Sequence, residues 1–458
     1  MIKPRVAVIG AGITGLAAAH RLIESGGVDV HVFDANGRPG GLLTTQRRGD
    51  YLIEHGADSF ITNKPAALDL CIRLGLESEL IRTNNDFRRS LVLHNGKPVA
   101  VPRGFQLLMP TDAEAIQASS LLSESGKQRV AKERDVPPRT ELADESVASF
   151  VKRRFGEELF DRLAQPMVGG IYTADPERLS LLATLPRFLQ MEVDHGSLAA
   201  AAEATEQQES SGARYGLFVS LRNGVQQMVE SLRERIERSH TIQCDNVVLS
   251  VEKAGSKFNI EFARGAQQFD AVVVTTSAWR AAELLGQKDE LTGLLQQIEY
   301  TSSAVVCSAH RLNDIEHAMD AFGLVIPSVE NRRILAVSFA SRKFADRAPD
   351  DCVLLRTFVG GAMQPEILEY SDAEISGIVQ SELSEIFGVR AEPEFSLVTR
   401  YDRAMPQYHL GHVERVRAIR KMVAAVSGLE LAGNAYEGVG IPDSIRSGEE
   451  AAERLFDV

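Results

Sequence analysis

A glycine-rich turn between a strand and a helix lies within the first fifteen residues, and it constrains the fold more than any other feature of the chain. Residues 5–9 form an apolar run typical of a buried strand, and the sequence GAGITG of residues 10–15 follows directly. Residues 16–24 then carry apolar side chains at helical spacing. A second apolar strand, residues 28–33, ends at Asp34, 19 residues beyond Gly15. This order predicts a Rossmann-type dinucleotide-binding unit.

Each position of the turn has a physical role in such a unit. Gly10 permits the tight turn, Gly12 lets a pyrophosphate approach the backbone, and Gly15 lets the helix pack closely on the strand. A carboxylate at the end of the second strand accepts hydrogen bonds from a ribose diol, whereas an ordinary glycine turn requires no acid there. The predicted contacts with the dinucleotide are Gly10, Ala11, Gly12, Ile13, Thr14, Gly15 and Asp34.

The residues after Asp34 favour FAD over NAD as the dinucleotide. Residues 35–41, ANGRPGG, form a second glycine cluster with an embedded arginine, which suits a flavin extended across the domain. Residues 54–59, EHGADS, supply another turn of small residues further along the chain. We predict additional cofactor contacts at Ala35, Arg38, Gly40 and Gly41.

Composition narrows the function classes. The net charge of −13 argues against a nucleic-acid-binding protein. The four cysteines are widely spaced and the ten histidines form no HExxH pattern, so we predict no metal site. The sequence has no apolar run of membrane-spanning length and no signal-peptide pattern at its start. We therefore expect a cytoplasmic protein.

The 458 residues exceed what one hydrophobic core accommodates, so several domains are expected. A pattern of strands, helices and glycine-rich turns typical of nucleotide-binding domains occurs in three separated segments, 1–90, 214–298 and 426–458. We assign these segments to one FAD-binding domain of the α/β class. Residues 103–213 are mostly helical in pattern, and residues 91–102 and 299–425 are rich in predicted strands. The last segment contains a glycine-rich loop between a short strand, residues 429–432, and a helix that starts near Pro442.

Six motifs together resemble the porphyrinogen oxidase family, FAD enzymes of haem synthesis that act on protoporphyrinogen IX or, in a bacterial branch, on coproporphyrinogen III. The third and the last are the most specific of them. The motifs are residues 10–15 with Asp34, 54–60 (EHGADSF), 169–180 (GGIYTADPERLS), 221–224 (LRNG), 405–408 (MPQY) and 433–442 (GNAYEGVGIP). The resemblance implies an α+β protein with an FAD domain, a β-rich substrate domain and a helical insert.

The resemblance also implies further cofactor contacts. The turn of residues 56–59 should lie along the flavin, Val247 should meet the adenine through its backbone, and Tyr401 should lie near the cofactor. Residues of the terminal loop should face the flavin ring, with the positive end of the following helix directed at the edge that becomes negative on reduction. The implied contacts are Gly56, Ala57, Asp58, Ser59, Val247, Tyr401, Gly433, Val439, Gly440 and Ile441.

For the substrate, the resemblance implies that Gly170 opens a loop over the porphyrinogen and that Phe339 packs on a pyrrole ring. Phe322 and Leu324 are further candidates, with ordinary core residues as the alternative. Plant-type members have an arginine where this chain has Ser90, which favours the coproporphyrinogen branch. Arg89 is then a candidate partner for a propionate, with a surface ion pair as the alternative.

The implied reaction is oxidation of a porphyrinogen to a porphyrin by three hydride transfers to FAD, with O2 as acceptor and H2O2 as product. No side chain is predicted to be catalytic, and His55 is expected to be a structural hydrogen-bonding residue. The alternatives are an amine oxidase or a carotenoid desaturase of the same fold, and a non-catalytic binding protein on that fold.

The partners expected are a small-molecule porphyrinogen, a ferrochelatase that receives the product, and a membrane surface met peripherally, but no nucleic acid. Phe105, Leu107, Leu108 and Met109 are expected to have a core or cleft-lining role, with a membrane-docking face as the alternative. The sequence leaves the oligomeric state open.

Overall fold

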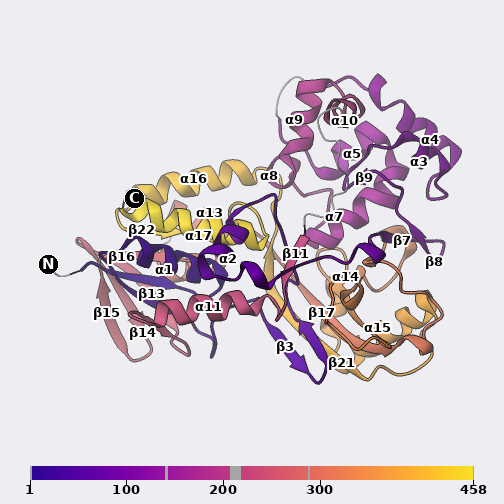
Figure 1. The fold of residues 1–458 in the computed structure, drawn as a ribbon. Coiled ribbons are helices and arrows are strands. Elements are labelled where there is room, and N and C mark those ends of the chain that lie inside the picture. The colour runs from indigo at the N-terminus through magenta and orange to yellow at the C-terminus, as the bar shows by residue number, and fades with distance from the viewer. Residues whose placement is uncertain (1–2, 140–142, 207–217, 287–288, 457–458) are drawn as a thin grey trace.

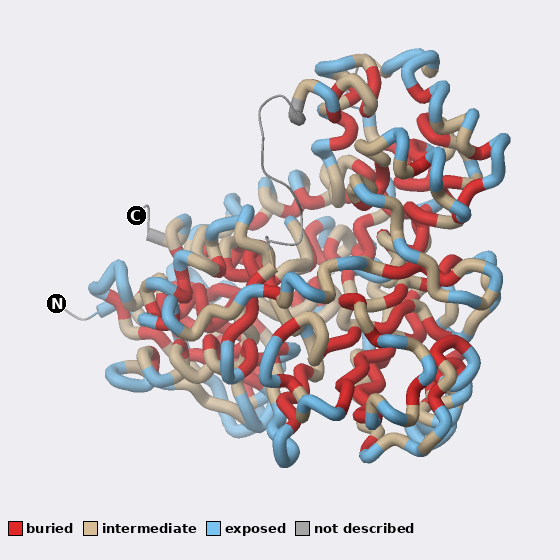
Figure 2. Tube along the Cα trace, turned by 45° about the vertical axis from the view of Figure 1, so that its right-hand side comes forward, coloured by how far each residue is buried: buried red, intermediate tan, exposed pale blue. Residues whose placement is uncertain are grey.

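The computed structural model describes residues 3–139, 143–206, 218–286 and 289–456. Three regions can be followed in Figure 1: a nucleotide-binding domain that carries both ends of the chain, a sheet-rich domain that includes α15 (Asp372–Phe387), and a group of helices above it. Buried segments run through each of the three regions in Figure 2. The predicted boundary at residues 213–214 lies outside the described residues.

The nucleotide-binding domain is built on a five-stranded parallel sheet from three separated parts of the chain. Its strands, in spatial order, are β12 (Thr241–Gln243), β2 (Asp29–Phe33), β1 (Arg5–Ile9), β16 (Ala271–Val274) and β22 (Leu429–Leu431). Because all five are parallel, their carboxyl ends meet at one edge, where ligands bind in folds of this type. The predicted fold class, a Rossmann-type domain assembled from separated segments, is confirmed.

Helices cover one face of this sheet, and a smaller sheet with further helices covers the other. The first face packs against α1 (Ile13–Ser25), α2 (Ala66–Leu74), α11 (Gln226–Glu237) and α17 (Ile441–Phe456). The second packs against the antiparallel strands β13 (Val248–Ala254), β14 (Lys257–Phe262) and β15 (Gly265–Phe269), and against α12 (Ala278–Leu285), α13 (Glu290–Gln296) and α16 (His412–Ala424).

The position of α16 corrects one predicted boundary. Its buried side chains Val416, Ile419 and Val423 pack in the core beneath the five-stranded sheet. The predicted division assigned this helix to the substrate domain and placed the boundary after residue 425. Because α16 shares its core with the nucleotide-binding domain, the boundary belongs before His412.

The second domain is a seven-stranded mixed sheet. Its strands, in order, are β21 (Phe395–Pro406), β17 (Tyr300–Arg311), β20 (Cys352–Gly360), β19 (Ala336–Phe339), β18 (Gly323–Val325), β7 (Ser90–His94) and β8 (Lys97–Ala100). The β7–β8 hairpin turns at Asn95 and Gly96, both at positive φ, as the Asn-Gly pair predicts. One face of the sheet packs on α15, and the other meets the hairpin of β3 (Thr45–Arg48) and β4 (Tyr51–Glu54).

Three short strands form a separate antiparallel sheet, in the order β5 (Phe60–Ile61), β11 (Phe218–Leu221) and β6 (Leu80–Arg82). The helical region comprises the small hairpin β9 (Phe105–Gln106) and β10 (Met109–Pro110), α3 (Ala113–Ala118), α4 (Glu124–Ala131), α5 (Val147–Phe155), α6 (Glu157–Leu159), α7 (Gln165–Tyr172), α8 (Leu181–Thr184), α9 (Pro186–His195) and α10 (Leu198–Glu206). Leu107, Leu108 and Met109 are buried in its core, in agreement with the core role expected for them and not with a membrane-docking face.

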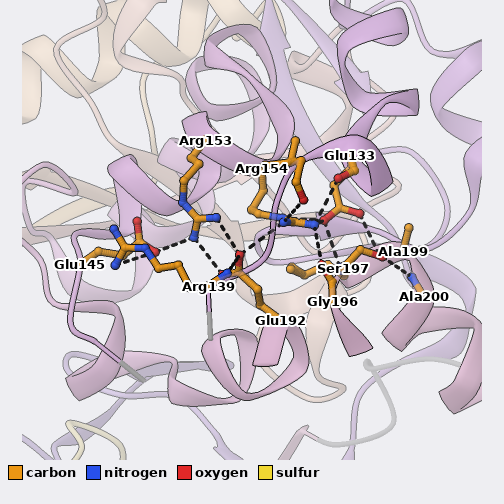
Figure 3. Close-up of polar contacts among 12 residues, drawn as sticks. Glu133, Arg139, Glu145, Arg153, Arg154, Glu192, Gly196, Ser197, Ala199 and Ala200 are labelled. Carbon is orange, nitrogen blue, oxygen red and sulfur yellow. Dashed lines mark hydrogen bonds and ion pairs between the residues drawn. The ribbon is translucent and has the colours of Figure 1, made fainter. Parts of the chain in front are cut away.

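A buried network of charges holds the helical region together (Figure 3). Arg154 of α5 is fully buried, donates to Glu133 through Nε at 2.6 Å, and lies 3.3 Å from Glu192 of α9. Arg153 donates to both carboxylate oxygens of Glu192, at 2.7 and 2.8 Å. Glu133 also accepts the backbone N–H of Leu198 at the start of α10, at 3.0 Å. Two arginines of α5 therefore fix α9 and α10 through buried carboxylates.

None of the helices in the described ranges is long and apolar enough to cross a bilayer.

Candidate active site

The loop of residues 10–15 lies at the carboxyl edge of the parallel sheet, between β1 and α1. Gly10 has φ of +105°, and a Cβ on Gly15 would lie 1.8 Å from the Gly10 carbonyl oxygen, so both positions require glycine. A Cβ on Gly12 would meet nothing within 4 Å. The first turn of α1 contains no acidic side chain. The loop therefore has open space beside the Gly12 backbone and the uncompensated N–H groups of a helix start, which fit an anion such as a pyrophosphate.

Asp34 is buried beside this loop. Its Oδ2 accepts the Ala11 N–H at 2.6 Å, and its Oδ1 accepts the backbone and side-chain N–H groups of Asn36 at 2.8 and 2.9 Å. A carboxylate offers about four acceptor positions, so Asp34 retains capacity for a ribose hydroxyl. The carboxylate also holds the glycine loop in place, a role that the sequence pattern alone did not indicate.

The predicted adenine side is a turn next to Asp34. The Asn246 N–H donates to the Asp34 carbonyl at 2.9 Å, and the Asp245 N–H donates to the Asn36 carbonyl at 3.0 Å. Val247 follows with 39% of its surface exposed. This turn brings the Val247 backbone beside the sequence that starts at Ala35, as the adenine assignment requires.

The second glycine cluster continues from the loop. Gly40 donates its N–H to the Ala11 carbonyl at 2.7 Å, and Gly41, at φ +57°, lies against the Gly12 Cα. Arg38 is exposed, and its guanidinium donates to the carbonyls of Pro39 and Gly41 at 3.2 and 3.3 Å. Arg38 therefore lies at the loop surface, where it can reach a bound phosphate.

The turn of residues 56–59 extends this line of backbone away from the glycine loop. A Cβ on Gly56 would lie 2.0 Å from the Leu42 carbonyl oxygen and 3.6 Å from the Tyr401 hydroxyl. The backbones of Gly12, Gly41, Leu42 and Gly56 thus form one continuous surface. This surface ends at Tyr401 on β21. Burial raises the pKa of Tyr401 to about 12, so its hydroxyl stays neutral.

Two cations that the sequence analysis missed hold this turn from the seven-stranded sheet side. Arg356 of β20 lies 3.0 Å from Asp58 Oδ2 and also donates to the Gly56 carbonyl. Lys343, at the end of α14 (Ala340–Lys343), lies 3.0 Å from Asp58 Oδ1 and 2.9 Å from the Ser59 hydroxyl. Both cations lie more than 280 residues from Asp58 in sequence, so no local pattern indicates the contact.

The charge of Asp58 depends on these two cations. Burial raises the pKa of this carboxyl, but Lys343 and Arg356 outweigh that effect and hold the pKa well below its usual range. The carboxylate is therefore ionised at all physiological pH values.

The terminal loop lies beside the glycine loop, far from it in sequence. A Cβ on Gly433 would lie 4.0 Å from the Thr14 hydroxyl, and Gly448 of α17 packs on the Thr14 carbonyl. The Gly433 N–H donates to the Ser447 hydroxyl at 3.0 Å. This arrangement agrees with the expected placement of the loop next to the first glycine turn.

The terminal loop also departs from expectation in two details. Asp443 lies in the first turn of α17, and Lys64 donates to both of its carboxylate oxygens at 2.8 Å, so an ion pair accompanies the positive end of this helix. Ile441 is 7% exposed and packs in the core of the nucleotide-binding domain, so only its backbone is available to a cofactor. Val439 is half-buried and packs against the helical region.

On the substrate side, Gly170 lies on α7 and a Cβ there would meet only Val325 of β18, at 3.8 Å. Val325 shares a face of the sheet with Arg356. Side chains of residues paired across antiparallel strands point the same way, and so do side chains two residues apart on one strand. This face, which carries Val325, Ser338 and Arg356, is the one directed toward α7 and the residue 56–59 turn.

Phe339 and Leu324 lie on the opposite face. Both are buried in the core formed with α15, and the Phe339 ring meets the Phe387 ring edge-on, with the centroids 5.4 Å apart. We therefore reassign these two residues from substrate contact to core. The physical reason is the two-residue period of a strand: each predicted residue lies one position away from a residue on the face directed toward α7.

The remaining substrate candidates are also engaged within the protein. Phe322 is 7% exposed, and its N–H donates to the Arg89 carbonyl at 2.9 Å. The Arg89 guanidinium pairs with the Asp320 carboxylate and donates to the Asp320 carbonyl at 2.9 Å. Arg89 thus forms the surface ion pair that was its alternative interpretation, and its assignment to a propionate stays a prediction.

No acid–base group emerges from these contacts. His55 lies 2.7 Å from the Thr399 hydroxyl and 2.9 Å from Gln46, and burial, Arg356 and Arg38 lower its pKa. It serves as a structural hydrogen-bonding residue, as expected. Across the part of the chain that the structure describes, no cluster of three or more metal-binding side chains is found.

The family model described as flavin containing amine oxidoreductase matches residues 13–456. The chain belongs to this family. It is therefore a flavoprotein, and its open glycine loop and the Asp34 carboxylate lie at the carboxyl edge of the parallel sheet, where ligands bind in folds of this type.

Three similar proteins with nearly full-length matches are named porphyrinogen oxidases. The chain is 33% identical to coproporphyrinogen III oxidase of Bacillus subtilis, over 98% of this chain and 97% of the relative. It is 31% identical to the enzyme of the same name from Staphylococcus aureus, with 98% of each chain covered. It is 30% identical to protoporphyrinogen oxidase 2 of Arabidopsis thaliana, over 99% of this chain and 94% of the relative.

Solved structures agree with the fold. A crystal structure from Exiguobacterium sp. 255-15, provisionally assigned as a protoporphyrinogen oxidase, superposes with a TM-score of 0.89 at 28% identity, over 99% of both chains. A reduced UDP-galactopyranose mutase superposes with a TM-score of 0.74 at 16% identity, over 99% of this chain and 96% of the other, which shows the shared fold alone.

Proposed function

We propose that this protein oxidises a porphyrinogen to the porphyrin with FAD as its cofactor, and that coproporphyrinogen III is preferred over protoporphyrinogen IX. One observation carries the proposal: the similarity to relatives named coproporphyrinogen III oxidase runs from end to end. The similarity therefore extends over the nucleotide-binding domain, the seven-stranded sheet and the helical region. The sheet and the helical region form the borders of the substrate side. Ser90, in place of the arginine of plant-type members, supports the preference.

The chemistry of a porphyrinogen suits a site without a side-chain base. Loss of hydride from a methylene bridge leaves a cation shared by the two flanking pyrrole rings, so the carbon needs no general base. A flavin, when bound, supplies the two-electron acceptor. The protein must then hold the substrate over the acceptor and exclude water. The backbone surface from Gly12 to Gly56, with the terminal loop beside the first glycine turn, supports these two tasks.

The overall reaction balances with oxygen as the final acceptor. Conversion of a porphyrinogen to a porphyrin removes six hydrogen atoms as three hydride–proton pairs. Each pair reduces one O2 to one H2O2, so three molecules of peroxide accompany each porphyrin. Successive hydride losses at one fixed position require the substrate to tautomerise between steps.

Of the two flavin cofactors FAD and FMN, FAD better fits the loops. The ribose-accepting carboxylate of Asp34 and the neighbouring turn at Val247 suit an adenosine half, and FMN has none. All four cysteines are free thiols, which suits a reducing compartment such as the cytoplasm.

The experiment is to supply coproporphyrinogen III and protoporphyrinogen IX separately to the purified holoprotein and to record porphyrin fluorescence and peroxide. We expect both products, in a ratio of one porphyrin to three peroxides, and faster turnover of coproporphyrinogen III. Gly12→Ala protein without flavin is the matched control, because non-enzymatic oxidation continues in it. Rates equal to that control with both substrates would refute the proposal.

A further inference from the structure

A buried cluster of opposite charges lies against the residue 56–59 turn and takes no part in the reaction described above. Arg356 is only 3% exposed in its side chain and Lys343 17%, and both contact the single carboxylate of Asp58. Asp58 is in turn fixed by the Ser59 hydroxyl at 2.7 Å, and the Ser220 hydroxyl donates to its carbonyl at 2.7 Å. The cluster joins the nucleotide-binding domain to the seven-stranded sheet at the point where the flavin is proposed to lie.

The cluster carries excess positive charge. Within the described ranges, Asp58 is the only carboxylate at ion-pair distance from either cation. Glu54 also interacts electrostatically with Arg356, but burial raises the pKa of this carboxyl to about 7, so it is only partly ionised at neutral pH. Arg347, 2% exposed, adds another buried cation that donates to the Ser220 hydroxyl and the Leu221 carbonyl. Arg356 and the largely buried Lys343 thus face the one carboxylate of Asp58, and Arg347 adds a third cation nearby.

Such an excess has a predictable effect on a neighbouring redox group. A flavin gains negative charge when it accepts a hydride, and buried cations stabilise that charge strongly because little water screens them. Asp58 acts in the opposite sense, because its carboxylate is held ionised and repels the added charge. The midpoint potential of the bound flavin then reflects the balance of these fixed charges.

We propose that Arg356 and Lys343 are positioning residues that raise the midpoint potential of the bound flavin, and that Asp58 partly offsets them. The inference rests on the proposed function in one respect, that the flavin lies along the residue 56–59 turn. A higher potential makes hydride acceptance more favourable at each of the successive oxidations. The contact between Arg356 and the Gly56 carbonyl adds a second role, because it fixes the backbone that would touch the flavin.

Charge substitutions of opposite sign separate this electrostatic role from a structural one. Lys343→Met removes a positive charge and Asp58→Asn removes the negative charge, yet both break the same 3.0 Å contact. A role in structure alone predicts that both variants shift the potential in the same direction. The electrostatic role predicts shifts of opposite sign.

The measurement is the midpoint potential of the flavin in the purified holoprotein, by anaerobic titration against a reference dye. We expect a lower potential in Lys343→Met and a higher potential in Asp58→Asn than in the wild type. Arg356→Lys, which keeps the charge, should change the potential less than Arg356→Met. Arg311→Met is the matched control, because Arg311 lies at the far end of β17, pairs with Asp351 and Glu394, and should leave the potential unchanged.

Shifts of the same sign in Lys343→Met and Asp58→Asn, or no shift in either, would overturn the inference. Loss of flavin from both variants would also overturn it, because the cluster would then serve binding alone. The proposed function is tested separately by porphyrinogen turnover of the wild type. If the variants show the expected shifts in potential but the wild type oxidises neither porphyrinogen, the proposed function is contradicted and the inference stands.

Discussion

The phenol ring of Tyr408 stacks on the imidazole ring of His412, with the centroids 4.1 Å apart and 14° between the planes. Each ring holds one carbonyl of the terminal loop. The Tyr408 hydroxyl donates to the Asn434 carbonyl at 2.6 Å, and His412 Nε2 lies 3.0 Å from the Tyr436 carbonyl. The MPQY motif, which ends at Tyr408, therefore anchors the glycine-rich loop that the flavin is proposed to meet.

The stacked pair predicts a dependence of stability on pH. His412 is 1% exposed, and burial lowers its pKa to about 4, against about 6.5 in an unfolded chain. The folded state therefore binds fewer protons than the unfolded state between these values, and the contribution to stability is complete above pH 6.5 and lost as the pH falls toward 4. The loss is about 1.4 kcal/mol per pH unit within that window.

Chemical denaturation of wild type and His412→Gln across pH 4 to 7 measures this contribution. Other buried histidines contribute to both proteins, so the difference between the two pH slopes isolates His412. We expect a shallower slope in the variant. Equal slopes would contradict the assigned role of His412.

Replacement of glycine by alanine should have different effects at two positions of the first glycine loop. Gly12→Ala places a methyl group in open space, so the protein should fold with near-normal stability but retain much less flavin. Gly15→Ala forces a Cβ to 1.8 Å from the Gly10 carbonyl, so the domain must shift and the melting temperature should fall. Thermal denaturation combined with flavin content distinguishes the two. Wild-type flavin content in Gly12→Ala would contradict the assignment of the loop to the cofactor.

The terminal loop offers a similar contrast. A Cβ on Gly438 would lie 2.3 Å from the Asp443 carboxyl carbon, at a φ of +89°, whereas a Cβ on Gly440 would lie 3.3 Å from Asp443 Oδ2 without a positive φ. Gly438→Ala should therefore destabilise more than Gly440→Ala, by at least the 1–2 kcal/mol or so that a left-handed alanine costs. Gly440→Val, with its larger side chain, should weaken flavin binding or reduction. Normal flavin content and turnover in Gly440→Val would show that the loop lies away from the flavin.

The charge network of the helical region predicts a large loss of stability on truncation. Arg154→Met leaves the buried carboxylate of Glu133 without its main partner and removes one of the two arginines that contact Glu192, at a cost of about 3–5 kcal/mol. Arg390→Met breaks an exposed pair with Glu316 and should cost no more than about 1 kcal/mol. Urea denaturation of both variants makes the comparison. A loss below 1 kcal/mol in Arg154→Met would mean that water reaches the network.

The features predicted correctly from sequence are those with a local cause. The order of strand, glycine turn, helix and acid fixes the geometry of the loop within 34 residues, because each glycine meets a steric requirement of its neighbours. The Asn95-Gly96 turn follows from local backbone preferences in the same way.

The features missed depend on contacts between distant segments. The pairing of Asp58 with Arg356 joins the residue 56–59 turn to β20, and no local pattern in either segment indicates this contact. Phe339 was placed on the wrong face because the direction of a short strand's side chains depends on which neighbours it pairs with, and here Ser338 rather than Phe339 shares the face of Arg356. The role of α16 depends on its core partners in the nucleotide-binding domain. The amphipathic pattern of the helix does not identify these partners.

The most direct test of the central claim is anaerobic mixing of the flavin-loaded protein with coproporphyrinogen III, with the absorbance of the oxidised flavin as the signal. We predict rapid bleaching at a rate that saturates with substrate, and one porphyrin for every three flavin reductions once oxygen is readmitted. Gly12→Ala protein, depleted of flavin, should give no such signal. A flavin that stays oxidised in the presence of both coproporphyrinogen III and protoporphyrinogen IX would contradict the account.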